Sequence, residues 1–584
     1  MIENLLSILI FLPLLVMILV LFLPKSLSRF LPWLSLLVTG VQLLLVSILS
    51  LDLQEFAITG INLQENFYQV EQIQWLLLNL GSLGQISIQY FVGIDALNSS
   101  LLLLSAIVMF VAAISAFEIK TKRKGFHALF LLLNASVTGC FLALDFFLFY
   151  LFFEFMLLPM YFLIGIWGGK RREYASIKFF IYTLAGSILI LIVMIGLYAS
   201  VIDPTATAVN LGLAENIQEV KDTHITQVQE MLLNGSLSED KQVHTFNMLA
   251  MMDARNFIPN SVFFKGNIAS FFGEHARLIA FLFLIVGFAI KLPAVPVHTW
   301  LPDAHVEAPT SISVILAGIL LKIGGYGMLR IAYSIFPEGA IYYAWWLGLA
   351  GVIAVVYAGF VALGTHNLKK LIAYSSVSHM GFVLLGIASL TAEGINGAIF
   401  QMFSHGIISA MLFLVAGVIY FRSNDLQIEN YRGIINKMPV YSALVIVAFF
   451  ASMGLPGFSG FIAELFVFLG AFKSQSANQL LPGWMAITAT LGLILGAAYY
   501  LWTLQRMFFG KFWTSNKSLN MQDLSSRELW MLVPLGIISL LLGIFPNTLL
   551  HFFEPGVAYF VDFILETGKI NMEAMSGGYE SITP

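Results

Sequence analysis

Charged residues are scarce in this sequence. Its 584 residues include 29 Lys and Arg and 33 Asp and Glu, so 11% of the chain is charged. A soluble domain carries about 25%, so the composition excludes an ordinary soluble globule, a disordered chain and a nucleic-acid binder. The formal net charge of −4 is too small to indicate a strongly acidic or basic partner.

Cysteines and phosphate-binding loops are also nearly absent. Cys140 is the single cysteine, and one thiol cannot form an internal disulfide, a cysteine-ligated zinc site or an iron–sulfur cluster. Neither GxGxxG nor GxxxxGK[ST] occurs in the chain. We therefore expect no cofactor on this chain, and any redox chemistry that it serves must use cofactors on other subunits.

Long apolar runs dominate what is present. Hydrophobic residues make up 59% of the chain, and runs of about 20 apolar residues, enough to cross a bilayer as a helix, recur along its length. The stretch Ile2–Leu23 lacks a basic start and a small-residue cleavage site, so we expect a retained first helix rather than a signal peptide. The sequence predicts an all-α polytopic membrane protein. The expected spans cover residues 3–23, 31–51, 92–117, 126–144, 146–168, 177–200, 276–300, 311–330, 341–363, 371–390, 398–420, 440–472, 484–506 and 529–550.

The charges between these fourteen spans predict the topology. Basic residues gather in alternate loops, which places those loops in the cytoplasm, whereas the other loops hold acids such as Asp52, Glu55, Glu65 and Glu71. Both termini are then expected on the periplasmic side of a bacterial inner membrane. The basic set comprises Lys25, Arg29, Lys120, Lys122, Arg123, Lys124, Lys170, Arg171, Arg172, Lys178, Lys369, Lys370, Arg422, Arg432, Lys437, Arg506, Lys511, Lys517 and Arg527.

Four regions follow from the spans. Residues 1–125 hold helices 1–3 and an external loop, 53–91, whose alternating pattern predicts a hairpin. A first repeat, 126–330, holds helices 4–8 and a polar, acidic insertion, 201–275. A second repeat, 341–506, holds helices 9–13, and residues 507–584 form helix 14 and a tail. The insertion, with helical spacing at 228–233 and 246–252, is either a solvated cap or a docking element for a neighbouring subunit.

A few ionisable residues lie deep inside the expected spans. A charge at the bilayer centre costs about 2.5–3.5 kcal/mol on insertion scales, so these groups should face the interior and pair with one another. Buried acids, amines and imidazoles can exchange protons because desolvation disfavours their charged forms, and the set as a whole favours a proton path. Its members are Glu154, Lys291, Lys322, His379, His405 and Glu464.

Each member also has a purely structural alternative. The two histidines could hydrogen-bond neighbouring helices, and Glu154 and Lys291 could form a static ion pair. Lys322 could extend towards the membrane surface, and Glu464 could cap a half-helix.

Two spans are expected to be broken. Lys291 is followed by Pro293 and Pro296, and Gly454-Leu-Pro-Gly457 lies one turn before Glu464. Proline removes a backbone donor, and irregular backbone at membrane depth is tolerated only where protein or water satisfies it. The breaks fall in spans seven and twelve, which cross in opposite directions. Inverted repeats of a transporter show this pattern.

A second polar cluster consists of His298, Asp303, His305 and Glu307, which we expect in a short cytoplasmic loop. Its spacing fits no standard metal motif, so a polar mouth for proton entry or a set of helix caps is favoured over a metal site. Asp95 and Asp145 lie at span ends, where acids are common and need no special role.

Five stretches resemble the antiporter-like membrane subunits of respiratory NADH:quinone oxidoreductase (complex I). The resemblance extends from about residue 90 to 510 and is greatest to the M type, called subunit 4 in mitochondria. That type has a glutamate in the broken twelfth helix, the position of Glu464, where the L and N types and the related antiporter chains have lysine. The stretches are Phe146–Gly169, Lys291–Thr310, Leu321–Gly327, Leu368–Leu385 and Gly454–Leu465.

The resemblance implies a role for each buried residue. Glu154 matches a fifth-helix glutamate that pairs with a seventh-helix lysine, here Lys291, and Lys322 matches an eighth-helix lysine that links two half-channels. His379 and His405 match relay positions that lead to the twelfth-helix glutamate, Glu464.

The resemblance also implies partners and an activity. The family's chains carry no NADH, FMN, iron–sulfur cluster or quinone site, so these are expected on partner subunits beside L-type and N-type neighbours. We expect a proton-translocating subunit of the oxidoreductase. The alternatives are a subunit of a cation/proton antiporter, a subunit of a membrane-bound hydrogenase, or a structural spacer.

Overall fold

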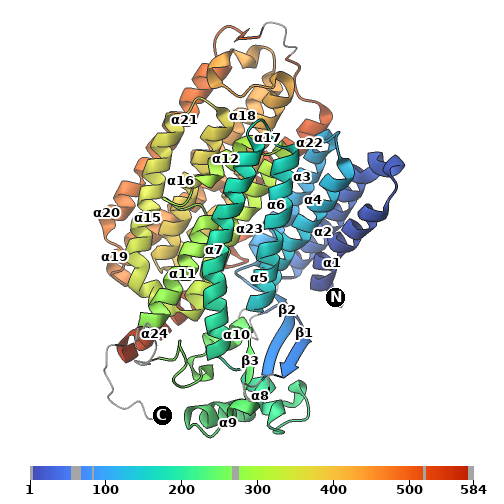
Figure 1. The fold of residues 1–584 in the computed structure, drawn as a ribbon. Helices are drawn as coiled ribbons and strands as arrows, with labels where there is room; N and C mark the ends of the chain where they lie inside the picture. The colour runs from blue at the N-terminus through green and yellow to red at the C-terminus, as the bar shows by residue number, and fades with distance from the viewer. Residues whose placement is uncertain are drawn as a thin grey trace.

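The protein is an elongated bundle of helices with a small sheet at one end (Figure 1). The computed structural model describes residues 4–53, 67–79, 81, 85–265, 275–516 and 521–575. Glu55, Glu65 and Lys517 lie outside these residues. Within the bundle the apolar runs are helical because a helix satisfies its own backbone hydrogen bonds where no water is present.

The N-terminal helices pack beside the first strand of the sheet. The carboxylate of Glu71 accepts hydrogen bonds from the backbone N–H of Leu6 (2.8 Å) and Ser7 (3.0 Å), which satisfies donors that the first turn of a helix leaves free. This contact fixes the start of the chain to the sheet. The helices are α1 (Leu5–Phe22), α2 (Leu31–Leu53), α3 (Ser99–Ser115) and α4 (Arg123–Leu142).

The next group of helices contains the first break. The expected seventh span, 276–300, is helical only as far as Lys291, in α11 (Ala276–Lys291), because the two prolines follow there. Helix α12 (Trp300–Glu307) begins at the last residue of that span. The eighth span contains two stretches of π-helix, Leu316–Leu320 and Met328–Tyr333, one on either side of the turn that carries Lys322. The other helices are α5 (Phe146–Phe155), α6 (Leu157–Trp167), α7 (Arg172–Ser200), α13 (Thr310–Ile315) and α14 (Leu321–Gly327).

The second group of helices also contains a break. The expected twelfth span is divided into α18 (Pro439–Ser452) and α19 (Ser459–Ala477), and the glycines and proline lie between them. The remaining helices are α15 (Pro337–Leu363), α16 (Leu368–Ala388), α17 (Ala392–Ser423), α20 (Gly483–Ala489), α21 (Leu491–Phe508), α22 (Ser526–Ile544), α23 (Asn547–Leu550) and α24 (Glu554–Met575).

Among the described residues, twelve helices are long and apolar enough to cross a membrane. These twelve correspond to twelve of the fourteen expected spans, and the two missing ones are the broken spans seven and twelve. The count of fourteen is thus not confirmed by continuous helices alone and stays a prediction. The most deeply buried spans are Thr310–Tyr333, Leu368–Ala388 and Ala392–Ser423, and these carry Lys322, His379 and His405.

The predicted hairpin is confirmed. Strands β1 (Gln69–Asn79) and β2 (Gln85–Ile94) pair antiparallel, and β3 (Val243–Thr245) from the insertion pairs parallel with β2. The expected helical stretches of the insertion lie in α9 (Asp222–Leu233) and α10 (Met248–Met252), beside α8 (Pro204–Asn210). The insertion is therefore joined to the hairpin through a shared sheet.

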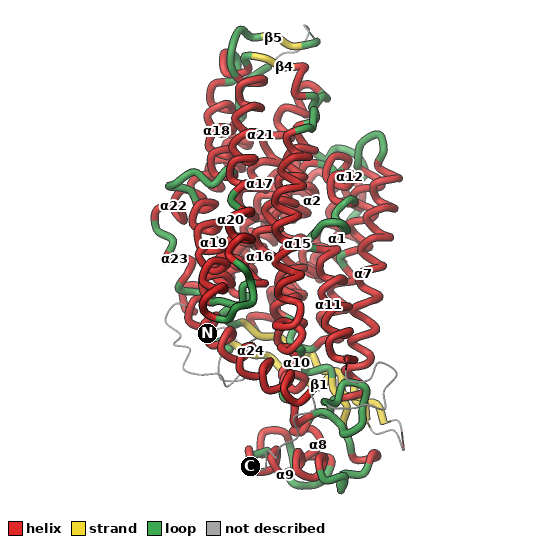
Figure 2. The backbone as a smooth tube through the Cα atoms, turned by 90° about the vertical axis from the view of Figure 1, so that its left-hand side faces the viewer, coloured by secondary structure: helices red, strands yellow, loops and turns green. Residues whose placement is uncertain are grey.

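The opposite end of the bundle carries the short strands β4 (Tyr431–Arg432) and β5 (Trp513–Thr514) (Figure 2). Helix α1 begins, and α24 lies, at the end with the three-stranded sheet (Figure 1). The two ends of the described chain are thus on the same side, as an even number of spans requires. Which side of the membrane this is stays a prediction.

The tail contains a helix that we did not expect. Helix α24 is held by Asn571, whose side chain donates a hydrogen bond to the buried Glu338 at 2.7 Å. The other carboxylate oxygen of Glu338 pairs with Arg277 at 2.5 Å. Hydropathy missed α24 because its apolar residues occupy one face only, on which Val557 and Ile564 are buried.

Candidate functional site

Four of the six predicted ionisable residues lie in two contacting pairs, and Glu154, outside these pairs, is only half-buried. The Nζ atom of Lys322 lies 2.7 Å from Nδ1 of His405, and it also donates a hydrogen bond to the carbonyl of Ala317. Nδ1 of His379 lies 3.4 Å from a carboxylate oxygen of Glu464. All four side chains are buried, so the two members of each pair lie next to each other away from bulk solvent.

The two pairs adjoin each other. The imidazole rings of His379 and His405 have centroids 5.5 Å apart. A cavity of about 10 Å³ beside both rings is large enough for roughly one water molecule. Lys322, His405, His379 and Glu464 thus form one series across three helices and a half-helix. The cavity is lined by His379, Gln401, Ser404, His405, Ile408, Ala451, Ser452 and Gly460.

Glu154 and Lys291 do not form the ion pair that the resemblance implied. No contact of 4.0 Å or less joins their charged atoms, and neither Oε1 of Glu154 nor Nζ of Lys291 has a hydrogen-bond partner in the described part of the chain. Nζ of Lys291 instead lies 4.5 Å from the ring centre of Phe153, a cation–π distance. Because Glu154 follows Phe153 in α5, the carboxylate of Glu154 and the ammonium of Lys291 lie in the same region without forming an ion pair.

Close helix packing connects the end of α11 to Lys322. The indole of Trp300 donates a hydrogen bond to the carbonyl of Ile290 at 2.9 Å, which satisfies a backbone acceptor freed at the break. A Cβ atom on Gly324 would lie 2.7 Å from the backbone nitrogen of Leu292. The glycine therefore lets the helix turn that carries Lys322 pack directly against the residue that follows Lys291.

Glycine has a similar role at the second break. Gly454 has φ +71°, and a Cβ atom there would collide with the carboxylate of Glu464. One carboxylate oxygen, Oε2, has no hydrogen-bond partner among the described residues. At this break, therefore, the backbone of Gly454, which has no side chain, packs directly against the carboxylate of Glu464.

We expected the second polar cluster in a loop, and this prediction was wrong: the cluster lies largely on α12. Pro302 is compatible with this helix because it occupies the first helical turn, where proline is tolerated. Its members do not converge, and no group of three potential metal ligands occurs among the described residues. Asp303 pairs with Lys178 at 2.7 Å, and Glu307 accepts a hydrogen bond from the backbone of Arg171 at 2.9 Å. His305 is buried, with its ring stacked 4.3 Å from that of Phe413.

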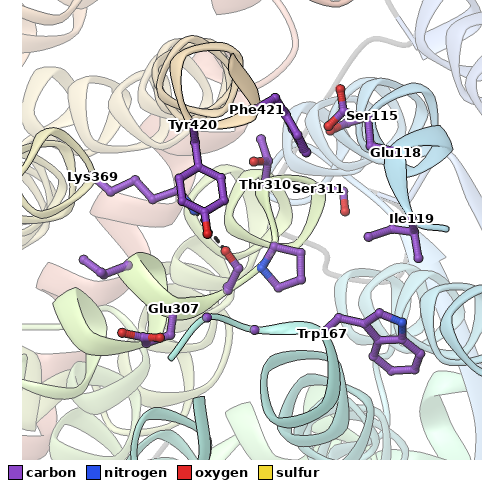
Figure 3. A pocket seen from close by; sticks show the side chains of 15 residues that line it. Ser115, Glu118, Ile119, Trp167, Glu307, Thr310, Ser311, Lys369, Tyr420 and Phe421 are labelled. Carbon is purple, nitrogen blue, oxygen red and sulfur yellow. Dashed lines mark hydrogen bonds between the residues drawn. The ribbon is translucent and has the colours of Figure 1, made fainter. Parts of the chain in front are cut away.

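A cavity of about 160 Å³ opens near this cluster, at the end of the bundle where the basic loops lie (Figure 3). Lys369 lies on its wall and donates a hydrogen bond from Nζ to the carbonyl of Ala308 at 3.0 Å. Glu118 and Glu307 supply acidic side chains. The cavity thus holds two acids and one base, and its wall includes Val306, the residue after His305.

Several contacts escaped sequence reasoning. Asp95 pairs with the buried Arg330 at 2.5 Å, and Asp145 accepts hydrogen bonds from the backbone of Leu148 and Gln89, so both acids have structural roles after all. Arg330 is the last residue of an expected span, and a basic residue at that place did not indicate a buried ion pair. The amide nitrogen of Gln401 lies 3.1 Å from Nδ1 of His379. Gln401 was not predicted because it is uncharged, and the predicted residues are all ionisable.

The sequence is similar to proteins from many bacteria. A family model described as NADH:quinone oxidoreductase/Mrp antiporter matches residues 143–235 and 244–492. NADH-quinone oxidoreductase subunit M of Rhodobacter capsulatus is 37% identical over 563 residues, which is 96% of each chain. The subunit of the same name from Rickettsia prowazekii is 36% identical over 516 residues, 88% of this chain and 91% of the relative.

The fold is similar to that of solved membrane complexes. A chain of respiratory complex I from Thermus thermophilus superposes with a TM-score of 0.73 at 27% identity, covering 96% of this chain and 99% of that one. A chain of the Mrp complex from a Dietzia species gives a TM-score of 0.72 at 20% identity, covering 98% and 99%. At that identity the second match shows a shared fold only.

Proposed function

The chain belongs to the NADH:quinone oxidoreductase/Mrp antiporter family of membrane subunits, and from this premise we propose that it is the M-type subunit that moves protons in a bacterial NADH:quinone oxidoreductase. The observation that carries the proposal is the buried series Lys322, His405, His379 and Glu464, whose contacts are 2.7 Å, one water-sized gap and 3.4 Å. A static bundle has no need of such a series at about 2.5–3.5 kcal/mol per charge.

The first step takes place at Glu154 and Lys291. Redox energy released in partner subunits changes the separation of these two charges. Proximity to the carboxylate stabilises the charged lysine, whereas separation leaves the ammonium desolvated and favours release of its proton. The open arrangement, with Nζ of Lys291 over Phe153 and without a hydrogen-bond partner among the described residues, supports Lys291 as the group that gives up the proton.

Later steps follow the buried series. The proton passes to Lys322, which the approach at Gly324 places beside the end of α11, and then to His405 by direct contact. A water in the cavity between the two imidazoles carries it to His379, and the carboxylate of Glu464 receives it. The cavity at Lys369 supplies the cytoplasmic entry, and His305 lies close enough to both Lys369 and Lys322 to interact with them electrostatically.

Partners and location follow from the same family. We expect L-type and N-type subunits as neighbours, with NADH, FMN, iron–sulfur clusters and quinone on other subunits, in the bacterial inner membrane with both termini periplasmic. Relatives of 36–37% identity are named as subunits of the quinone oxidoreductase, whereas the antiporter chain is similar in fold alone. The antiporter and hydrogenase alternatives therefore have less support.

The test is mutation of the first pair in the whole complex. Lys291→Ala and Glu154→Ala should each leave the complex assembled, because Nζ of Lys291 and Oε1 of Glu154 have no hydrogen-bond partner among the described residues. NADH oxidation coupled to proton pumping should fall at least about tenfold, a barrier increase of roughly 1.4 kcal/mol. Normal pumping by both assembled variants would contradict the proposal.

A further inference from the structure

A chain of buried hydroxyl groups ends at His379, on the side of the ring away from Glu464. Oγ of Ser452 lies 3.3 Å from Nε2 of His379 and 2.7 Å from the phenol oxygen of Tyr500. Tyr500 donates a hydrogen bond to Oγ of Ser375 at 3.0 Å, and Ser375 donates to the backbone carbonyl of Ile372 at 2.8 Å. The three hydroxyl residues are buried and come from three helices, α16, α18 and α21.

The carbonyl at the end of this chain fixes its direction. A carbonyl oxygen can only accept, and each hydroxyl has one hydrogen to donate. The hydrogen of Ser375 goes to Ile372, so Tyr500 donates to Ser375, and Ser452 must then donate to Tyr500. Ser452 has no hydrogen left for the imidazole and can only accept, so Nε2 of His379 carries a hydrogen.

The other ring nitrogen is therefore the one whose protonation changes. Nδ1 of His379 lies 3.1 Å from the amide nitrogen of Gln401 and 3.4 Å from a carboxylate oxygen of Glu464. In the neutral ring Nδ1 accepts a hydrogen bond from Gln401. In the charged ring Nδ1–H donates to Glu464, while Nε2–H keeps its bond to Ser452 in both states.

We propose that Ser452, Tyr500 and Ser375 are positioning residues that fix the tautomer of His379, so that Nδ1 alone gains and loses the transferred proton. This inference rests on the proposed function, because it assumes that His379 relays protons. The hydroxyl chain ends at a backbone carbonyl, so it orients the imidazole and does not conduct. The titratable groups that face His379 are Glu464 on α19, His405 on α17 and Tyr500 on α21.

The test uses five variants of the intact complex. Tyr500→Phe and Ser452→Ala remove links of the chain. Tyr499→Phe is the matched control, because it removes the same atom from an equally buried neighbour outside the chain, and Ser452→Thr keeps a hydroxyl at the same place. His379→Ala tests the relay itself. The measurements are the amount of assembled complex, protons pumped per NADH, and the pH profile of pumping.

Loss of one buried hydrogen bond predicts about three- to tenfold weaker pumping in Tyr500→Phe and Ser452→Ala. Because the other tautomer becomes accessible, the pH profile of their residual pumping should also shift. Tyr499→Phe and Ser452→Thr should retain the rate and pH profile of the unaltered complex. Structural damage alone would lower the rate without moving the profile.

Two results separate the inference from the function on which it rests. If His379→Ala abolishes pumping while Tyr500→Phe and Ser452→Ala pump with an unchanged pH profile, the positioning role is overturned and the relay stands. If His379→Ala pumps normally, the proposed relay itself fails. An equal loss in Tyr499→Phe and Tyr500→Phe would show a packing effect and also overturn the inference.

Discussion

At the scale of single residues, charge in an apolar run is the signal that sequence carries best. Lys322 and Glu464 were predictable because a bare charge in a span is costly, and both are buried in the structure. Ser452 and Tyr500, which orient His379, were not predictable, since hydroxyl groups are common in apolar helices and cost little. The separation of Glu154 from Lys291 also depends on packing around Phe153 that no residue pattern encodes.

Asp145 gives a prediction at this scale. Burial raises the pKa of its carboxyl to about 7, although backbone hydrogen bonds from Leu148 and Gln89 oppose the shift. The folded pKa lies above the unfolded value of about 4. The contribution of Asp145 to the stability of the folded state is therefore fully present below about pH 4 and is lost as the pH rises through about 7. Hydrogen exchange of the β2 amides, corrected for intrinsic rates, should therefore show greater protection at pH 5 than at pH 8.

The matched variant for this prediction is Asp145→Asn, which keeps an acceptor oxygen but cannot ionise. Its β2 amides should have the same corrected protection at pH 5 and pH 8. A pH dependence that survives in Asp145→Asn would assign the effect to another group.

At the scale of elements, the broken helices were predictable and the irregular ones were not. Prolines and glycines mark the breaks between α11 and α12 and between α18 and α19, because they deprive the backbone of donors or allow positive φ. The π-helical stretches beside Lys322 have no proline, and Gly318 is their one glycine, so no comparable pattern of residues marks them. The C-terminal α24 escaped because hydropathy alone does not detect a helix with one apolar face.

Gly454 gives the prediction at this scale. Gly454→Ala places a Cβ atom against the carboxylate of Glu464 at φ +71°, with a backbone cost of about 1–2 kcal/mol. Proton pumping should fall at least about tenfold in the assembled complex, because displacement of Glu464 breaks the end of the buried series.

Gly457→Ala is the control for the backbone cost. Gly457 also has positive φ, at +100°, but nothing lies within 4 Å of a Cβ atom there. Its pumping should stay near that of the unaltered complex even if its stability falls. Equal losses in the two variants would show that strain at the break, and not contact with Glu464, lowers pumping.

At the scale of the whole molecule, charge asymmetry predicts which end faces the cytoplasm. The three-stranded sheet and the acidic insertion lie at one end, and the basic loops lie at the other (Figures 1 and 2). Cysteine labelling in intact cells tests the assignment, with the buried Cys140 as background. An impermeant maleimide should modify Asp222→Cys in the insertion but not Lys170→Cys in a basic loop, and the reverse result would invert the topology.

The central claim is that the buried series carries protons through this chain. The most direct measurement is the number of protons pumped per NADH oxidised by the intact complex with Lys322→Met, a change to an unbranched side chain that is one atom shorter and has no proton to transfer. Nζ of Lys322 contacts His405 directly, so the substitution removes the one atom that joins Lys322 to the rest of the series. The account predicts an assembled complex with fewer protons pumped per NADH, and an unchanged ratio at the normal rate of NADH oxidation would contradict it.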